Sequence, residues 1–258
     1  MNILVSNDDS ISARGVHALI DRLVKFGKVT AICPKYPQSG QSMALTVNSP
    51  IRIAQLPDYN GARMFSATGT PVDCIKIAMH HLLDHRPDLI VSGINHGSNA
   101  AVNVLYSGTM GAAMEGVTFG IPSIGFSLTD HSPNANFEPC FKAIDHLVRE
   151  TLKNGLPDGV CLNVNVPNIE TTPGEMRLCT PCKGRWDDEY KEYTDPFGGK
   201  FYWLSGSFDN FEPDNTETDE WALAHGMVSV VPVAVERSAS TAIEVPWLAA
   251  ACQSYRQF

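Results

Sequence analysis

The chain has 258 residues, of which 43% are hydrophobic and 18% charged, and its formal net charge is −9 at pH 7. This composition is typical of a globular protein, and the length suffices for one large α/β domain or for a core with an appendage. Because nonspecific affinity for nucleic acid depends on clustered Lys and Arg, the negative net charge argues against duplex nucleic acid as a partner. Mononucleotides remain possible ligands.

The chain opens with an apolar run that ends in two adjacent carboxylates. Residues 3–5 are typical of a strand buried on both faces of a parallel sheet, and Asn7, Asp8 and Asp9 follow at once. Open α/β sheets bind ligands just beyond the carboxyl ends of their strands, and a hard divalent cation would offset the repulsion between the two acids. The alternative is that Asp8 caps the next helix and Asp9 lies in its first turn.

The next segments alternate between helix and strand. Apolar residues at helical spacing over 16–24 predict a helix that stops at Gly27, and residues 28–33 predict a second strand. The loop over 34–43 is rich in Pro, Gly and hydroxyl side chains, which fits either a ligand-facing loop or an ordinary connection. Residues 44–67 predict short strands, one near 48–50, and a hairpin turn over 58–61.

Two more polar segments follow. Thr70 is the expected cap of the helix after it, and the strand over 89–91 runs into a small-residue loop that ends in Asn95, so that two strand ends converge. Ser107 and Thr109 flank Gly108 at the start of a small-residue helix, where hydroxyls and unpaired N–H groups would hold phosphate. The alternative, close packing of this helix on the sheet, leaves the hydroxyls unexplained.

The pattern changes after about residue 167. A strand over 121–127, a helix over 137–152 and a strand over 160–166 complete the alternation that predicts a mostly parallel sheet with helices on both faces. Residues 180–220 are rich in aromatic and acidic side chains around a hairpin turn at Gly198 and Gly199, which fits either an arm exchanged in a dimer or a flap over its own domain. A strand over 227–233 and a helix over 244–255 follow. We therefore divide the chain into a core over 1–179 and an oligomerisation extension over 180–258.

Cysteine usage and hydropathy indicate the compartment. The seven cysteines are an odd number scattered through predicted core elements, which fits buried thiols better than disulfides, and the lone pair Cys179 and Cys182 lacks partners for a zinc site. No signal pattern precedes the first strand, and no apolar run approaches a membrane span. We expect a cytoplasmic protein with no membrane partner.

Several of these motifs, in this order, resemble those of the SurE (survival protein E) family of metal-dependent nucleotidases. The segments that carry the resemblance are Asn7 to Asp9, Ser39 and Gly40, Gly69 to Asp73, Ser92 to Asn95, and Tyr106 to Thr109, and the similarity extends to the late segments Thr218 to Ala222 and Ser229 to Pro232. The resemblance implies a Rossmann-like core, a C-terminal extension exchanged between subunits of a dimer or tetramer, and hydrolysis of nucleoside 5′- and also 3′-monophosphates. It implies one divalent cation per subunit, Mg²⁺ or Mn²⁺, with Ca²⁺ as a substitute in a crystal.

The resemblance also assigns site residues. It implies that the metal is held by Asp8, Asp9, Ser39 and Asn95, and that phosphate or substrate is bound by Asn99, Ser107, Gly108 and Thr109. Asp8 and Asp9 are the catalytic residues, and Asp9 is preferred as acceptor of the water proton. The chain departs from the family pattern at Ser10, Ala101 and Asn103, which puts the shape of the 96–106 loop in question.

Other classes fit less well. A dinucleotide-dependent oxidoreductase needs a G-x-G-x-x-G pattern after the first strand, which residues 7–15 lack. A receiver-type signalling domain needs a phosphoacceptor Asp where Ser92 and Asn95 stand, and a haloacid-dehalogenase-like phosphatase needs a different spacing of acids. His96 could protonate a leaving oxygen, but a lone loop histidine is more often solvated, so we leave it out of the catalytic set. A non-catalytic metal-dependent nucleotide-binding module and a short-chain exopolyphosphatase remain as alternatives.

Overall fold

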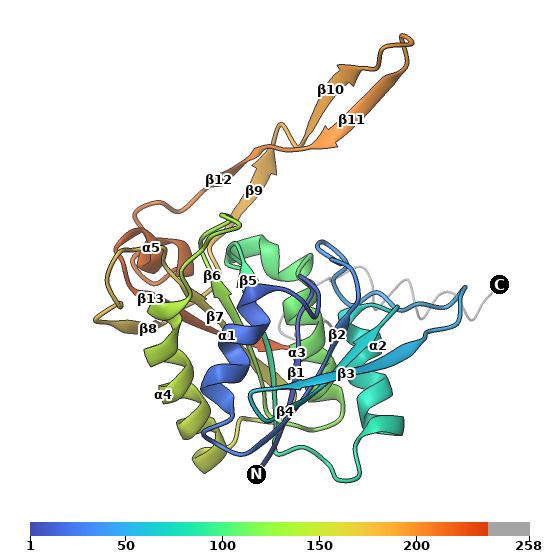
Figure 1. The fold of residues 1–258 in the computed structure, drawn as a ribbon. Coiled ribbons are helices and arrows are strands. Elements are labelled where there is room, and N and C mark those ends of the chain that lie inside the picture. Colours follow the sequence, from blue (N-terminus) through green and yellow to red (C-terminus); the bar gives the residue numbers. More distant parts are fainter. Residues whose placement is uncertain (237–258) are drawn as a thin grey trace, which may run out of the picture.

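The computed structural model describes residues 1–236, and within them a nine-stranded sheet carries helices on both faces (Figure 1). The strand order is β3-β4-β2-β1-β5-β6-β7-β13-β8. The central strands run parallel to one another. They are β1 (Asn2–Ser6), β2 (Lys28–Pro34), β4 (Ala62–Ala67), β5 (Leu89–His96), β6 (Ser123–Leu128) and β7 (Val160–Val166). The predicted α/β class and mostly parallel sheet are confirmed.

The remaining strands of the sheet lie at its two edges. β3 (Ile53–Tyr59) pairs antiparallel to β4, and Asn60 and Gly61, both with positive φ, form the predicted hairpin turn. β13 (Val228–Ala234) pairs antiparallel to β7 and parallel to the short β8 (Met176–Leu178). The strand predicted near 48–50 is wrong, since residues 44–52 form a loop.

The apolar opening run is explained by burial on both faces of the sheet. Ile3 and Val5 point into the cluster under α1 (Arg14–Leu23) and α4 (Glu138–Asn154). Leu4 points into the opposite cluster, under α2 (Pro71–Ile77), the π-helical turn η1 (Ala78–Leu82) and α3 (Gly108–Thr118). A strand that packs against helices on both sides has no polar face, which is why its sequence shows no alternation.

Local signals set the helix ends. Thr70 caps α2 as predicted, in a capping box in which Asp73 N donates to the Thr70 hydroxyl and Thr70 N donates to the Asp73 carboxylate. α1 ends at Leu23, before Gly27, whose added Cβ would lie 2.2 Å from the carbonyl oxygen of Met1. Gly27 therefore allows the chain to pass close to the first strand.

The strand order places a switch point between β1 and β5. From β1 the chain builds outward through β2 to β4, then returns to add β5, β6 and β7 on the other side of β1. At the carboxyl ends of the two neighbours, Ser6 lies beside Ser92 in the register. Loops that leave adjacent strands in opposite directions open a crevice at such a point, and ligands of open α/β sheets bind there.

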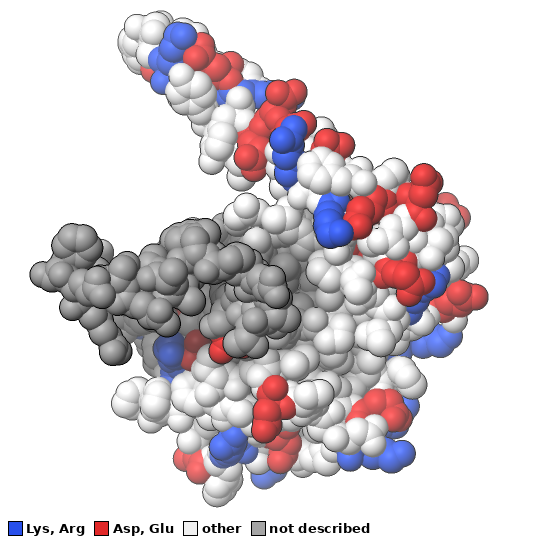
Figure 2. Space-filling model, turned by 180° about the vertical axis from the view of Figure 1, so that it is seen from behind, with Lys and Arg blue, Asp and Glu red and all other residues white. Residues whose placement is uncertain are grey.

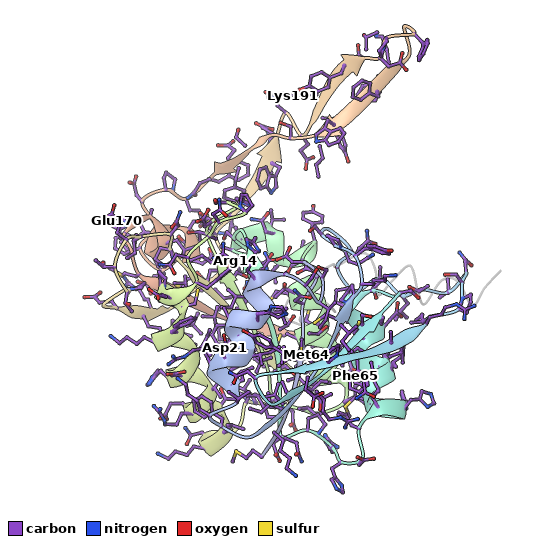
Figure 3. All side chains as sticks on the ribbon, in the orientation of Figure 1. Arg14, Asp21, Met64, Phe65, Glu170 and Lys191 are labelled. Carbon is purple, nitrogen blue, oxygen red and sulfur yellow. The ribbon has the colours of Figure 1, made fainter. Side chains whose placement is uncertain are left out.

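After β8 the chain leaves the sheet in a long arm, residues 184–210 (Figure 1). β9 (Gly184–Asp187) pairs with β12 (Ser207–Asn210), and β10 (Tyr190–Thr194) pairs with β11 (Lys200–Leu204) around the predicted turn at Gly198 and Gly199. The hairpin points away from the sheet, as the position of Lys191 in Figure 3 shows, so it is not a flap over its own domain. Acidic and basic side chains are interspersed along it in the view of Figure 2.

The chain then returns through α5 (Asp219–Ala224) to β13. β13, which the sequence analysis grouped with the extension, lies inside the main sheet between β7 and β8. The division at residue 180 stays a prediction, and the predicted helix over 244–255 lies outside the described residues. Within the described part of the chain, no helix combines the length and the apolar character needed to cross a membrane.

Candidate metal and phosphate site

Asp8 and Asp9 stand at the switch point directly after β1. Asp8 is 3% exposed, and its Oδ1 accepts a 2.5 Å hydrogen bond from the Thr109 hydroxyl. Burial, and second the charge of Asp9, raise the pKa of Asp8 from 3.8 to about 6. The helix-cap alternative is wrong, because α1 begins only at Arg14, its cap is Ala13, and its first turn holds no acid.

Two other predicted ligands lie near this pair. Asn95 is the penultimate residue of β5, and the Thr109 hydroxyl lies 3.5 Å from its Oδ1, so Thr109 stands between Asp8 and Asn95. Ser39 lies in an exposed turn, and Gln38 N donates to the carbonyl oxygen of Asp8 at 2.7 Å, which holds this turn beside the first strand. The carboxyl ends of β1 and β5 therefore bring Asp8, Asp9 and Asn95 close together, and the turn that holds Ser39 is bonded to Asp8 through its neighbour Gln38.

The donor set fits a hard divalent cation. Among the described residues the ion-pair partner of Asp9 is His96, and Asp8 has no Lys or Arg partner, so two neighbouring carboxylates lie largely out of water without a fixed positive charge. In the same residues no three His, Cys, Asp or Glu side chains gather, so a site must use the neutral oxygens of Ser39 and Asn95 as well. An all-oxygen set suits Mg²⁺, Mn²⁺ or Ca²⁺ better than Zn²⁺.

The N-terminus of α3 lies against Asp8. Ser107 is the N-cap, and its hydroxyl accepts from Met110 N at 3.0 Å. The positive end of the helix dipole therefore faces the carboxylate pair and the space a phosphate would occupy. The close-packing alternative holds for the same helix, because a Cβ on Gly116 would lie 2.3 Å from Ser123 Oγ in β6 and 2.7 Å from Ile90 Cδ1 in β5. Close packing accounts for the small residues, whereas the Ser107 hydroxyl caps the helix and the Thr109 hydroxyl donates to Asp8.

Gly108 gives a direct test of this contact. A Cβ added there would lie 2.8 Å from the Cβ of Asp8 and 2.9 Å from its Oδ2, so Gly108→Ala must push α3 and the first carboxylate apart. We expect the variant to be destabilised by about 1–3 kcal/mol, as overpacked sites are. Equilibrium unfolding in denaturant measures this. Gly174→Ala is the matched control, because no atom lies within 4 Å of its added Cβ; equal stability of the two variants would contradict the contact.

Asn99 is part of the loop over 97–106 and lies in a network of amides. Its backbone N–H donates to Asn165 Oδ1, its Nδ2 donates to Ser127 Oγ, and its carbonyl oxygen accepts from Asn163 Nδ2, each at 2.8 Å. The side chain is 5% exposed. Side chains of β6 and β7 therefore hold Asn99 in place. Its role in phosphate binding stays a prediction.

The structure places two further residues near the site: His96, which the sequence analysis weighed and left out of the catalytic set, and Asp219. His96 is the last residue of β5, and its backbone N–H and its Nδ1 lie 3.1 and 3.2 Å from Asp9 Oδ2. Its ring packs edge-on against Phe137. Asp219, which lies 118 positions after Ala101 in the sequence, accepts a hydrogen bond from Ala101 N. Adjacency to Asn95 was a signal for His96, whereas Asp219 belongs to a segment that carries the resemblance but had no role assigned to it.

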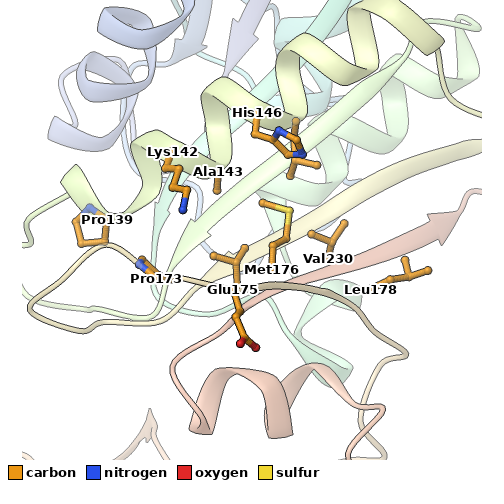
Figure 4. A pocket seen from close by; sticks show the side chains of 12 residues that line it. Pro139, Lys142, Ala143, His146, Pro173, Glu175, Met176, Leu178 and Val230 are labelled. Atoms are coloured by element: carbon orange, nitrogen blue, oxygen red, sulfur yellow. The ribbon is translucent and has the colours of Figure 1, made fainter.

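A cavity of about 450 Å³ lies elsewhere, between α4 and the β8–β13 edge of the sheet (Figure 4). Lys142 and His146 on α4 face Met176 and Val230 across it. It contains none of the predicted site residues. This cavity is therefore separate from the predicted site at the switch point.

Comparisons with known proteins agree with the sequence motifs. A family model described as "Survival protein SurE" matches residues 3–188. Proteins named 5'-nucleotidase SurE from Bacteroides fragilis and Phocaeicola vulgatus are 45% and 42% identical over 237 residues, which is 92% of this chain and 92% of each relative. The crystal structure of the SurE protein from Aquifex aeolicus superposes with a TM-score of 0.81 at 30% identity and covers all of both chains.

Proposed function

This chain belongs to the SurE family, and from that premise we propose that it is a metal-dependent phosphomonoesterase. Its substrates are nucleoside 5′-monophosphates, with 3′-monophosphates as further substrates, and its products are nucleoside and phosphate. One observation carries the proposal: Thr109 at the start of α3 touches both Asp8 and Asn95, so the helix N-terminus and the strand-end carboxylates meet at one point.

The metal would be held by Asp8, Asp9, Ser39 and Asn95. When bound, a divalent cation there would lower the pKa of a water molecule and offset the negative charge that develops on the phosphoryl group. The buried Asp8 beside the partly exposed Asp9 supports this assignment, because burial and the charge of Asp9 raise the pKa of Asp8 and a bound cation would offset both.

The other roles belong to the chain's own groups. The N-terminus of α3, with Ser107, Gly108 and Thr109, binds the phosphate through its N–H groups and dipole. The Thr109 hydroxyl fixes the orientation of Asp8. Asp9 accepts the proton of the attacking water: its side chain is 18% exposed, against 3% for the whole of Asp8, so it is the carboxylate that water reaches more readily.

A panel of substrates tests the proposal against its alternatives. Phosphate release is measured from 5′- and 3′-nucleoside monophosphates and from short polyphosphate, with Mn²⁺, with Mg²⁺ and with a chelator. We expect release from the monophosphates that requires a cation and stops with the chelator. No release, with metal-dependent nucleotide binding retained, would instead support a non-catalytic binding module, and release from polyphosphate alone would support a short-chain exopolyphosphatase.

We also propose that the chain forms a homo-oligomer through the extension, as a dimer or a tetramer. The arm exposes large apolar and aromatic side chains that an unpartnered hairpin would leave in water. They are Tyr190, Tyr193, Phe197, Phe201, Tyr202, Trp203 and Leu204. Sedimentation of the full chain tests this, and a monomer at micromolar concentration contradicts it.

A cytoplasmic location completes the proposal. The buried cysteines Cys33, Cys74, Cys140 and Cys161 are free thiols, as a reducing compartment favours. Cell fractionation tests it, with recovery in the cytoplasmic fraction as the expected result.

A further inference from the structure

The loop over 97–106 contains the predicted substrate residue Asn99 and leads to the N-terminus of α3. Its last part is a 3₁₀ turn, η2 (Ala101–Leu105). The carbonyl oxygen of Asn103 in this turn accepts a hydrogen bond from Ser107 N at 3.1 Å. The carbonyl oxygen of Tyr106 accepts from Ser42 N at 3.0 Å. A shift of η2 would therefore move the cap of α3, and with it the donors proposed to bind phosphate.

Asp219 is bonded to this turn from the far end of the chain. It is the first residue of α5 and is fully buried, and its Oδ2 accepts from Ala101 N at 2.7 Å. Its Oδ1 accepts from Cys182 N at 2.8 Å, so one carboxylate joins η2 to the base of the arm. Ala101 has a φ of +51°, in the left-handed region that disfavours residues with a Cβ. A strong, charge-assisted acceptor on its N–H therefore helps to hold an unfavourable turn.

A second contact runs between the same two parts. Trp186 in β9 donates from its Nε1 to Asn103 Oδ1 at 2.7 Å. Its ring packs edge-on against Phe208 in β12, so the indole is fixed to the base of the arm. Two hydrogen bonds from residues beyond 180 thus fix the first and the middle residue of η2, which leads into the proposed phosphate site.

We propose that Asp219 is a positioning residue for phosphate binding: it sets the η2 turn, and through Asn103 and Ser107 the N-terminus of α3. The inference rests on the proposed function, since it concerns the same site. Asp219 does not touch phosphate, and it acts through backbone groups of the loop. Its removal affects the phosphate site more than the metal ligands Asp8 and Asp9, which follow β1 and have no bond to Asp219.

The test uses Asp219→Asn in the full chain loaded with Mn²⁺, and inorganic phosphate as the probe. The carboxylate accepts from three backbone N–H groups: Ala101 N on Oδ2, and Cys182 N and Glu220 N on Oδ1. The amide of asparagine supplies one acceptor oxygen in place of two, so the N–H groups on one side are left facing an NH₂ group. We expect phosphate affinity to weaken about five- to tenfold, as the loss of one buried hydrogen bond predicts, and KM for a nucleoside monophosphate to rise in parallel. Mn²⁺ affinity should change by less than about twofold. Glu220→Gln removes the neighbouring charge on α5 and is the matched control, with native binding expected.

The outcomes separate positioning from a merely structural role. A folded Asp219→Asn with native phosphate affinity and native KM overturns the inference, even if its unfolding temperature falls. An equal loss in Glu220→Gln overturns it too, because it would point to charge alone. If Asp219→Asn does not fold, the variant Trp186→Phe is used instead, because it removes the hydrogen bond to Asn103 and keeps an aromatic ring. Weaker phosphate binding by this variant supports the inference, and unchanged phosphate binding overturns it. A natural chain that binds phosphate without turnover contradicts the proposed function and leaves this test in place.

Discussion

Asp9→Asn is expected to lower the rate of phosphate release from a nucleoside monophosphate by about three orders of magnitude, because it removes a metal ligand and a proton acceptor in one change. Asp8→Asn should have an effect of the same order through the loss of the buried ligand. The replacement preserves size, and the amide oxygen at position 8 can still accept from the Thr109 hydroxyl, so the fold is retained. Initial rates with saturating Mn²⁺ measure the effect.

Asp158→Asn is the matched control for these variants. Asp158 is exposed and precedes β7, at the edge of the sheet opposite the site, and the same change of charge there should leave the rate unaltered. A rate in Asp9→Asn within about tenfold of the natural chain would mean that the strand-end carboxylates are not the catalytic metal ligands.

Asp8→Asn should also stabilise the protein when all metal is removed, by up to about 3 kcal/mol near neutral pH. The pKa of Asp8 rises to about 6 in the folded chain because of burial and the charge of Asp9, so the folded state holds this proton more tightly than the unfolded state. The stabilisation of the folded state by this tighter proton binding is fully present below about pH 4 and is lost as the pH rises through about 6. Asparagine carries no charge and escapes this loss.

Denaturant unfolding in the presence of a chelator, at about pH 4 and about pH 7.5, measures the difference between the two proteins. The gain from Asp8→Asn should be largest at the higher pH and shrink at the lower one. Added Mn²⁺ should reverse the order of stability, because only the natural chain binds it well. An equal gain at both pH values would contradict the link to Asp8 ionisation.

The parts of the site that follow from strand ends could be predicted from the sequence. Asp8 and Asn95 each come after a buried apolar run, and parallel strands deliver such residues to the same edge of the sheet. Caps are equally local: Thr70 and Ser107 both accept from the backbone N–H three residues on, as their positions before a helix predict.

The rest depends on contacts between segments far apart in the sequence. β13 lies inside the sheet because it pairs with β7, and no short-range pattern distinguishes that from a strand in a separate extension. His96 could not be placed on Asp9 without knowing that β5 continues past the end of β1 to residue 96, where it pairs with β6. Asp219 reads locally as an acid in the first turn of a helix, whereas its carboxylate in fact bonds Ala101.

Titration of Mn²⁺ into the metal-free chain, for the natural protein and for Asp9→Asn, tests the central claim most directly, because it reads out the proposed cation site without requiring turnover. We predict one Mn²⁺ bound per natural chain and an affinity at least about tenfold weaker in the variant. The absence of saturable binding, or equal binding by both proteins, would contradict a metal site built on the carboxylates that follow the first strand.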